Sequence, residues 1–176
     1  ISDEERDRLD TLPLTEERIL RLSGAPAMWG DSRFTPAERI AARPTLEVNG
    51  IWGGYTGPGA KTVIPAEAHA KISCRLVPDQ RPQDVRDQLD TYLRDHVPES
   101  ITWEVEEMAG GSPYYSSPDS PAHTAFASAL RRVWDRDPLL SRHGGSVPVT
   151  THLQELLDVP SILSGFALPD DQIHSP

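Results

Sequence analysis

The sequence predicts an α+β fold, in which an antiparallel sheet carries helices on one face. The clearest observation is the alternation of small or apolar residues with polar residues from Ala66 to Leu76, which is typical of a strand with one buried face. One-sided alternation of this kind favours an antiparallel sheet. The second observation is the switch to a helical spacing of apolar residues at 82–97, after which alternation returns at 101–106. Strands and helix in this order are expected to pack as two layers.

Three short helices are predicted in residues 1–45, each from its start signal. Ser2 and Thr35 are each followed three residues later by Glu, which is a capping-box pattern. Thr15 is followed at once by two acidic residues, which also favour a helix start. Gly24 is expected to end the second helix, and Pro44 limits the third because the residue before a proline disfavours helix.

A hairpin is predicted next, from a strand at 46–52 through a glycine-rich turn to the long alternating strand. The turn resembles a phosphate-binding loop only superficially. Ala60 separates Gly59 from Lys61, which breaks the required spacing, and a strand rather than a helix follows. After the helix at 82–97, Ile101–Glu106 predicts a third strand.

A loop at 108–118, rich in proline and glycine, predicts a domain boundary. We therefore expect one domain at 1–107 and part of a second at 108–176. The second part is too small to form a domain alone. It is expected to contain helices that start at Pro121 and near Pro148, and a buried strand at 160–166.

Composition disfavours several classes of function. Lys and Arg number 17 against 27 Asp and Glu, and the resulting net charge of −10 disfavours nucleic-acid binding. No apolar run approaches the roughly 20 residues of a membrane span, so we expect no membrane partner and a cytoplasmic protein. Cys74 is the only cysteine, which excludes an internal disulfide framework and a cysteine-based zinc site. Because the chain starts at Ile1 rather than Met, we expect a piece of a longer protein.

Three positions are candidates for a functional site, and each also has an ordinary structural explanation. Arg75 lies on the polar face of the long strand, either as a solvated side chain or as a planar cation for a carboxylate. The turn at 144–146 is either a plain helix N-cap or an anion-binding turn. His174, after the predicted strand at 160–166, is either a surface-loop residue or a metal ligand. Thr62, at the entrance of the long strand, is a weaker candidate. One histidine cannot complete a catalytic zinc site, which takes three or more protein ligands.

Five segments, in this order and at this spacing, together resemble the M20 family of metallopeptidases, and within it the zinc dipeptidases related to carnosinase and glutamate carboxypeptidase. The similarity covers residues 40–176 well and residues 1–40 loosely. The segments are Asn49–Gly57 (NGIWGGYTG), Lys61–Ala66 (KTVIPA), Lys71–Pro78 (KISCRLVP), Gly144–Pro148 (GGSVP) and Gly165–His174 (GFALPDDQIH).

The resemblance implies an enzyme of two domains. Residues 1–107 would be most of an antiparallel-sheet lid, or dimerisation, domain, and 108–176 the C-terminal part of an α/β catalytic domain that binds two zinc ions or other divalent metals. The complete protein would be a homodimer that hydrolyses the peptide bond of small peptides with a free C-terminal carboxylate. The alternative is a non-catalytic dimerisation or binding module of the lid type.

The resemblance also assigns roles by position. His174 matches the last metal-binding histidine of the family, and Arg75 and Ser146, with Gly145 beside it, match residues that hold the substrate's carboxylate. Thr62 matches a lid threonine that reaches the active site, in the dipeptidases across the dimer. The other metal ligands and the catalytic glutamate would lie upstream of Ile1, so we expect this chain to contain no catalytic residue and to be inactive by itself.

Overall fold

The computed structural model describes residues 1–108, 110–144, 147–168 and 171. They form two compact units, of which the first is Ile1–Pro113 with Leu139–Val147, and the second is Tyr114–Pro138 with Pro148–Pro176. The return of Leu139–Val147 to the first unit was not predicted from the sequence. The proposed domain boundary at residue 107 is a statement about the complete protein and stays a prediction.

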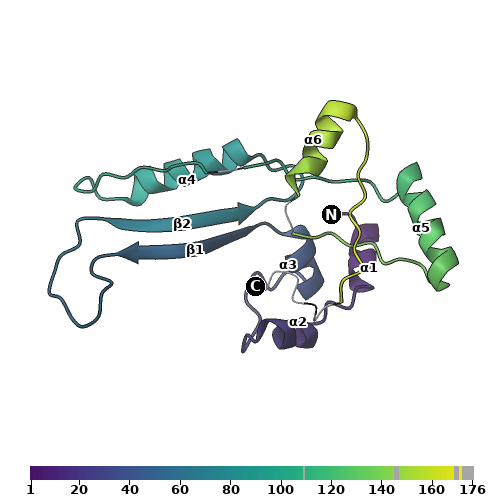
Figure 1. Cartoon of the computed structure of the whole chain (residues 1–176), viewed down its shortest axis with the longest axis horizontal. Coiled ribbons are helices and arrows are strands. Elements are labelled where there is room, and N and C mark those ends of the chain that lie inside the picture. The colour runs from purple at the N-terminus through teal and green to yellow at the C-terminus, as the bar shows by residue number, and fades with distance from the viewer. Residues whose placement is uncertain (109, 145–146, 169–170, 172–176) are drawn as a thin grey trace. The chain divides into compact units, whose positions relative to one another are not determined.

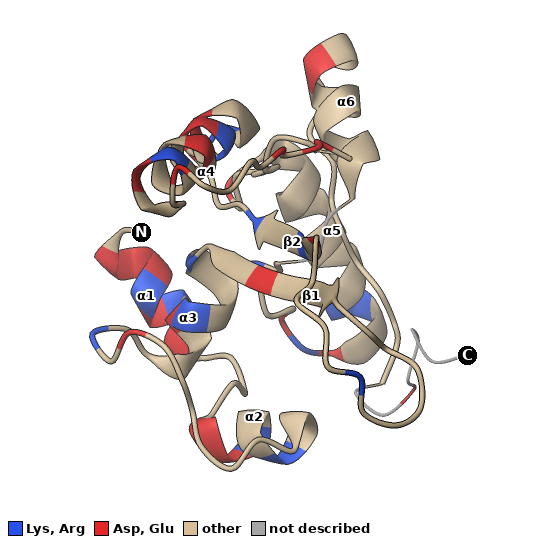
Figure 2. Ribbon diagram, turned by 90° about the vertical axis from the view of Figure 1, so that its left-hand side faces the viewer, with Lys and Arg blue, Asp and Glu red and all other residues tan. Residues whose placement is uncertain are grey.

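Three short helices begin the first unit (Figure 1). Each starts at a capping residue that the sequence predicts. They are α1 (Asp3–Asp10), α2 (Glu16–Ser23) and α3 (Pro36–Ala42). The hydroxyl groups of Ser2, Thr15 and Thr35 each accept a hydrogen bond from a backbone N–H in the first turn, and Gly24 ends α2 with φ of 69°. Acidic residues in the first turn of α1, coloured red in Figure 2, lie where the helix dipole favours negative charge.

The buried core of this unit lies between α1 and α3. Leu9 of α1 is 2% exposed and packs with Ala37 and Ala41 of α3. An ion pair also joins the two helices, with 2.8 Å between Arg6 Nε and Glu38 Oε1. Among the described hydrophobic residues only these three are fully buried.

The sheet is an antiparallel hairpin of β1 (Thr45–Gly53) and β2 (Ala68–Arg75) (Figure 1). Thr45 pairs with Arg75 at one end and Gly53 with Ala68 at the other, with an irregularity between Val48 and Gly50. The α+β class and the hairpin are confirmed. The predicted buried face is wrong: Leu46, Val48 and Ile72, which the register places on that face, remain 45–64% exposed.

The predicted third strand at 101–106 is wrong. α4 (Pro82–His96) forms as expected, but the segment after it pairs with no strand, and the described residues contain one sheet of two strands. Arg86 Nη2 of α4 donates a 3.0 Å hydrogen bond to the Val105 carbonyl. A side chain of the helix, rather than a neighbouring strand, therefore satisfies that backbone group.

The second unit contains the two predicted helices, α5 (Pro121–Trp134) and α6 (Pro148–Leu157). The expected buried strand at 160–166 is wrong, because no strand lies beside it in the described part of this unit and Phe166 is 74% exposed. The Tyr114 hydroxyl fixes this segment instead: it donates to the Ser161 carbonyl at 3.0 Å and accepts from the Ser161 N–H at 2.5 Å. In the part of the chain that the structure describes, no helix has the length and apolar character that a membrane span requires.

Candidate functional site

Arg75 ends β2 on the polar face of the hairpin. The register pairs Thr45 with Arg75 and Glu47 with Ser73. Directly opposed residues point to the same side of an antiparallel pair, and residues two apart on one strand do so as well. These four polar residues therefore share one face at the open end of the hairpin.

Glu47 is the centre of the contacts on this face. Thr45 Oγ1 donates a 2.5 Å hydrogen bond to Glu47 Oε1, and Ser73 Oγ donates a 3.3 Å bond to Glu47 Oε2. Arg75 Nε lies 3.8 Å from Glu47 Oε1, with the two side chains 54% and 40% exposed. Each carboxylate oxygen thus has a hydroxyl donor, and the nearby guanidinium supplies the opposite charge.

The other end of the Arg75 guanidinium contacts the turn before α6. Arg75 Nη1 donates a short hydrogen bond to the carbonyl of Gly144, 69 positions away in the sequence. A Cβ at Gly144 would lie 3.6 Å from Arg75 Cδ, which is ordinary van der Waals contact, so Arg75 packs closely over this residue. Arg75 is therefore not simply a solvated side chain of the sheet.

A second contact holds the same segment to the first unit. Arg142 Nε lies 2.5 Å from Glu5 Oε1 of α1, and the two side chains are only 22% and 13% exposed. The segment 139–144 is thus attached through Arg142 to α1 and through Gly144 to β2.

The other predicted site residues are not brought to Arg75 by the described structure. Gly145 and Ser146 follow Gly144 directly but lie outside the described residues, as does His174. Thr62 is exposed in the turn between β1 and β2, beyond the Gly53–Ala68 end of the hairpin. Arg75 is at the opposite end, seven residues or about 23 Å along β2. Within one chain, Thr62 and Arg75 therefore lie toward opposite ends of the hairpin.

The described residues do not fit a metal site by themselves. No group of three or more His, Cys, Asp or Glu side chains is close enough to hold a metal ion in the described part of the chain. Partial burial, with a smaller contribution from Glu47, raises the pKa of the Cys74 thiol and so disfavours the thiolate form that binds metals or acts as a nucleophile.

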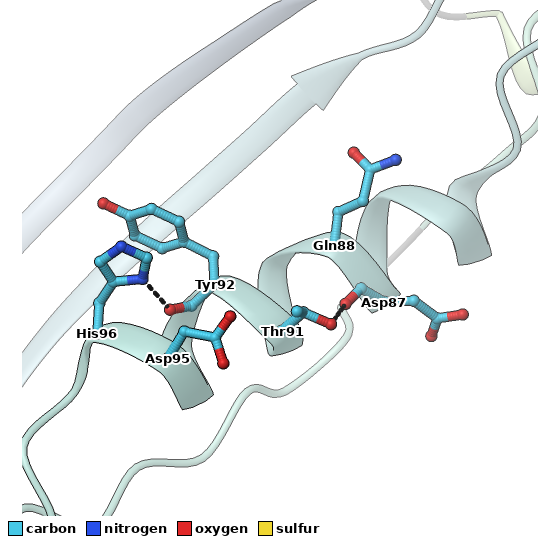
Figure 3. A pocket seen from close by; sticks show the side chains of 6 residues that line it. All are labelled: Asp87, Gln88, Thr91, Tyr92, Asp95 and His96. Atoms are coloured by element: carbon cyan, nitrogen blue, oxygen red, sulfur yellow. Dashed lines mark hydrogen bonds between the residues drawn. The ribbon is translucent and has the colours of Figure 1, made fainter.

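A shallow pocket on α4 was not predicted and carries no evident chemistry (Figure 3). The Tyr92 and His96 rings stack with their centres 4.0 Å apart, and His96 Nδ1 lies 2.8 Å from the Tyr92 carbonyl. Thr91 Oγ1 donates to the Asp87 carbonyl at 2.8 Å. These polar groups are engaged within their own helix.

Glu47 is the residue of the candidate site that sequence reasoning missed. Its spacing of two from Thr45 places both residues on one face of the strand, which is readable from the sequence. Its position beside Arg75 depends on the register of the hairpin, and a turn of this length does not determine that register.

Comparison with known proteins identifies the family. Residues 7–101 match the model of the M20 peptidase dimerisation domain. The chain is 30% identical over 182 residues to the Cys-Gly metallodipeptidase DUG1 of Candida albicans, an alignment that covers 99% of the chain and 37% of that protein. It is 31% identical over 135 residues to the human Beta-Ala-His dipeptidase, in an alignment that covers 75% of the chain and 27% of that protein.

Solved structures agree with these matches. The M20 family metallo-carboxypeptidase Sso-CP2 from Sulfolobus solfataricus superposes with a TM-score of 0.76 at 26% identity, over 89% of the chain and 35% of that protein. Human carnosine dipeptidase 1 superposes with a TM-score of 0.75 at 26% identity, over 91% of the chain and 35% of that protein. The chain thus spans about a third of the length of these relatives. It belongs to the M20 family of peptidases, and residues 7–101 are the family's peptidase dimerisation domain.

Proposed function

We propose that the complete protein is a metal-dependent dipeptidase, and that this chain supplies its dimerisation domain together with part of the site that holds the substrate's C-terminal carboxylate. The names of the relatives support the activity, because they include Cys-Gly and Beta-Ala-His dipeptidases and a metallo-carboxypeptidase. Small peptides with a free C-terminal carboxylate are the proposed substrates.

The contact of Arg75 with Gly144 is the observation that carries the proposal. It joins the predicted carboxylate-binding arginine to the residue just before Gly145 and Ser146, the other two proposed carboxylate-binding residues. A guanidinium offers a planar set of N–H donors that matches a carboxylate, and backbone N–H groups at the start of a helix favour an anion. Thr62 would contact substrate from the other end of the hairpin, in the active site of the second subunit.

Metal dependence is part of the proposal for the complete protein. Two zinc ions, or other divalent metals, would polarise the scissile carbonyl and activate water there. His174 is the one proposed ligand in this chain. The described residues form no metal site, so we assign them binding and orientation of the substrate and no step of bond cleavage.

A homodimer formed through the domain at 7–101 completes the proposal, with a small peptide as the other partner. The net charge of −10 supports the absence of a nucleic-acid partner. We extend the proposal to a cytoplasmic location without a membrane partner. The second candidate is a non-catalytic dimerisation module, which is favoured by the match of 7–101 to a dimerisation domain.

The test uses the complete purified protein and matched substrates. We expect it to hydrolyse Cys-Gly or Beta-Ala-His, to hydrolyse the C-terminal amides of the same dipeptides much more slowly, to lose activity with a chelator, and to regain it with Zn²⁺. No hydrolysis under any metal condition, together with a stable dimer, would favour the non-catalytic module. Equal rates on acids and amides would contradict the carboxylate-binding role.

A further inference from the structure

We propose that Glu47 is a positioning residue for Arg75: it holds one edge of the guanidinium while Gly144 holds another, so that Arg75 is oriented before substrate arrives. This inference rests on the proposed carboxylate-binding function of Arg75. It adds a residue on β1 that acts on substrate only through the arginine of β2.

The Glu47 carboxylate is itself fixed in place. Each of its two oxygens accepts a hydrogen bond from a hydroxyl, one from Thr45 on the same strand and one from Ser73 on the opposite strand. A glutamate tied to both strands of the hairpin loses much of its rotamer freedom. It can therefore act as a fixed negative charge rather than a mobile surface side chain.

Two edges of the Arg75 guanidinium face groups on different elements. Nε faces Glu47 Oε1 at 3.8 Å, and Nη1 donates to the Gly144 carbonyl. Among the described residues no hydrogen bond reaches Nη2. Because the guanidinium is planar, the hydrogen bond at Nη1 and the negative charge beside Nε together favour one orientation of its plane, and hence one direction of Nη2. The remaining N–H donors are then available to a carboxylate in a set orientation.

Orientation before binding has a specific kinetic signature. An arginine that is already ordered loses less side-chain entropy when substrate binds. The C-terminal carboxylate keeps its bonds and its charge while the peptide bond is cleaved. We therefore expect Arg75 to hold it equally in the ground state and the transition state, so that this effect changes KM rather than kcat. A substrate without the carboxylate gains nothing from it.

The test compares the complete enzyme with its Glu47→Gln variant, which keeps the shape of the side chain and removes the charge. For a dipeptide with a free carboxylate we expect KM to rise roughly two- to five-fold, the range that partly exposed ion pairs contribute, with kcat unchanged. The C-terminal amide of the same dipeptide should show no change. Glu4→Gln is the matched control, because it removes an exposed glutamate that pairs with Arg8 at 3.4 Å on α1.

The outcomes separate this inference from the function on which it rests. An unchanged or lowered KM in Glu47→Gln, or equal changes on acid and amide, would overturn the positioning role. If Arg75→Lys loses activity selectively on the acid but Glu47→Gln does not, the Glu47 inference alone is wrong. If Arg75→Lys shows no selectivity, the carboxylate-binding role and the Glu47 inference are both wrong. Should Glu47→Gln fail to fold, Ser73→Ala removes one of the two bonds that fix Glu47, and we expect the same selectivity with a smaller rise in KM.

Discussion

For Arg75, the sequence predicts the face of the strand on which it lies but not the residues that it contacts. The alternation of apolar and polar residues is enough to place Arg75 on the polar face of its strand. Its contact with Gly144 joins residues 69 positions apart, and its approach to Glu47 depends on strand register. A local sequence pattern indicates neither a contact between residues so far apart in the sequence nor the register of two strands. The partners of Arg75 could therefore not be predicted from residue spacing.

Thr35 and Glu38 form the residue-scale feature on which stability depends most clearly. Thr35 Oγ1 accepts from the Glu38 N–H at 3.2 Å, and Glu38 Oε2 accepts from the Thr35 N–H at 2.8 Å. We expect Thr35→Ala to lower the free energy of unfolding by about 0.5–2 kcal/mol, the usual cost of losing such a cap. Urea denaturation measures this change.

Thr15→Ala is the control for that cap. It removes the equivalent hydroxyl from α2, which has no buried residue, whereas α3 buries Ala37 and Ala41. We expect a smaller loss than for Thr35→Ala. Equal losses in both variants would show that the cap of α3 has no particular importance to the core.

The same cap predicts a dependence of stability on pH. The Thr35 N–H, and then Arg6, lower the pKa of the buried Glu38 carboxyl below its ordinary value. Its ionised form therefore stabilises the fold above the ordinary pKa, and this contribution is lost as the pH falls through the lowered pKa of the folded state. We expect the stability difference between the natural chain and Glu38→Gln, measured as Tm between pH 7 and pH 3, to shrink as the pH falls. A constant difference would contradict this role.

At the scale of elements, helices were predicted better than strands. Helix starts are marked locally by capping side chains, and Ser2, Thr15 and Thr35 cap as expected. A strand exists only beside another strand, and alternation does not show whether a partner is present. This explains why 101–106 and 160–166 have the sequence pattern of strands without forming them.

The hairpin exposes the apolar face that the alternating sequence pattern predicts to be buried. Leu46 is 64% exposed, Val48 57% and Ile72 45%, and all three lie on the face opposite Glu47 and Arg75. Exposed apolar residues that gather on one face favour association with another surface. We expect the 176-residue chain to self-associate, with a sedimentation coefficient that rises with protein concentration.

Ile72→Lys tests the part played by this face. A charge there makes its burial in an interface costly, and we expect the concentration dependence to weaken. Thr91→Lys, on the exposed side of α4, is the control and should leave association unchanged. A monomer at every concentration of the natural chain would contradict the proposed association surface.

At the scale of the whole molecule, two observations stand together: the chain buries few hydrophobic residues, and it matches only part of its relatives' length. The fully buried hydrophobic residues of the described structure are Leu9, Ala37 and Ala41, and the chain spans about a third of the length of its relatives. The family could be recognised from five short segments because their order and spacing are specific in combination. The proposed function assigns the other metal ligands and the catalytic glutamate to residues outside this chain.

The isolated chain should therefore be inactive. We expect the purified 176-residue chain with added Zn²⁺ to hydrolyse no dipeptide, because the described residues form no metal site and His174 is the single ligand that we propose. Product release from Cys-Gly, followed by chromatography, measures this. Robust, chelator-sensitive hydrolysis by the isolated chain would contradict the proposal that most of the metal ligands lie outside it.

The most direct measurement is kcat/KM of Arg75→Lys in the complete enzyme, on a dipeptide and on its C-terminal amide. Lysine keeps the charge but loses the planar set of donors. Loss of one hydrogen bond to a charged group costs about 1.5–3 kcal/mol, so we expect kcat/KM for the free-carboxylate dipeptide to fall roughly 10- to 150-fold. The amide should begin slow and change much less. Equal losses on the two substrates would contradict the central claim and leave Arg75 as a structural residue that joins β2 to Gly144.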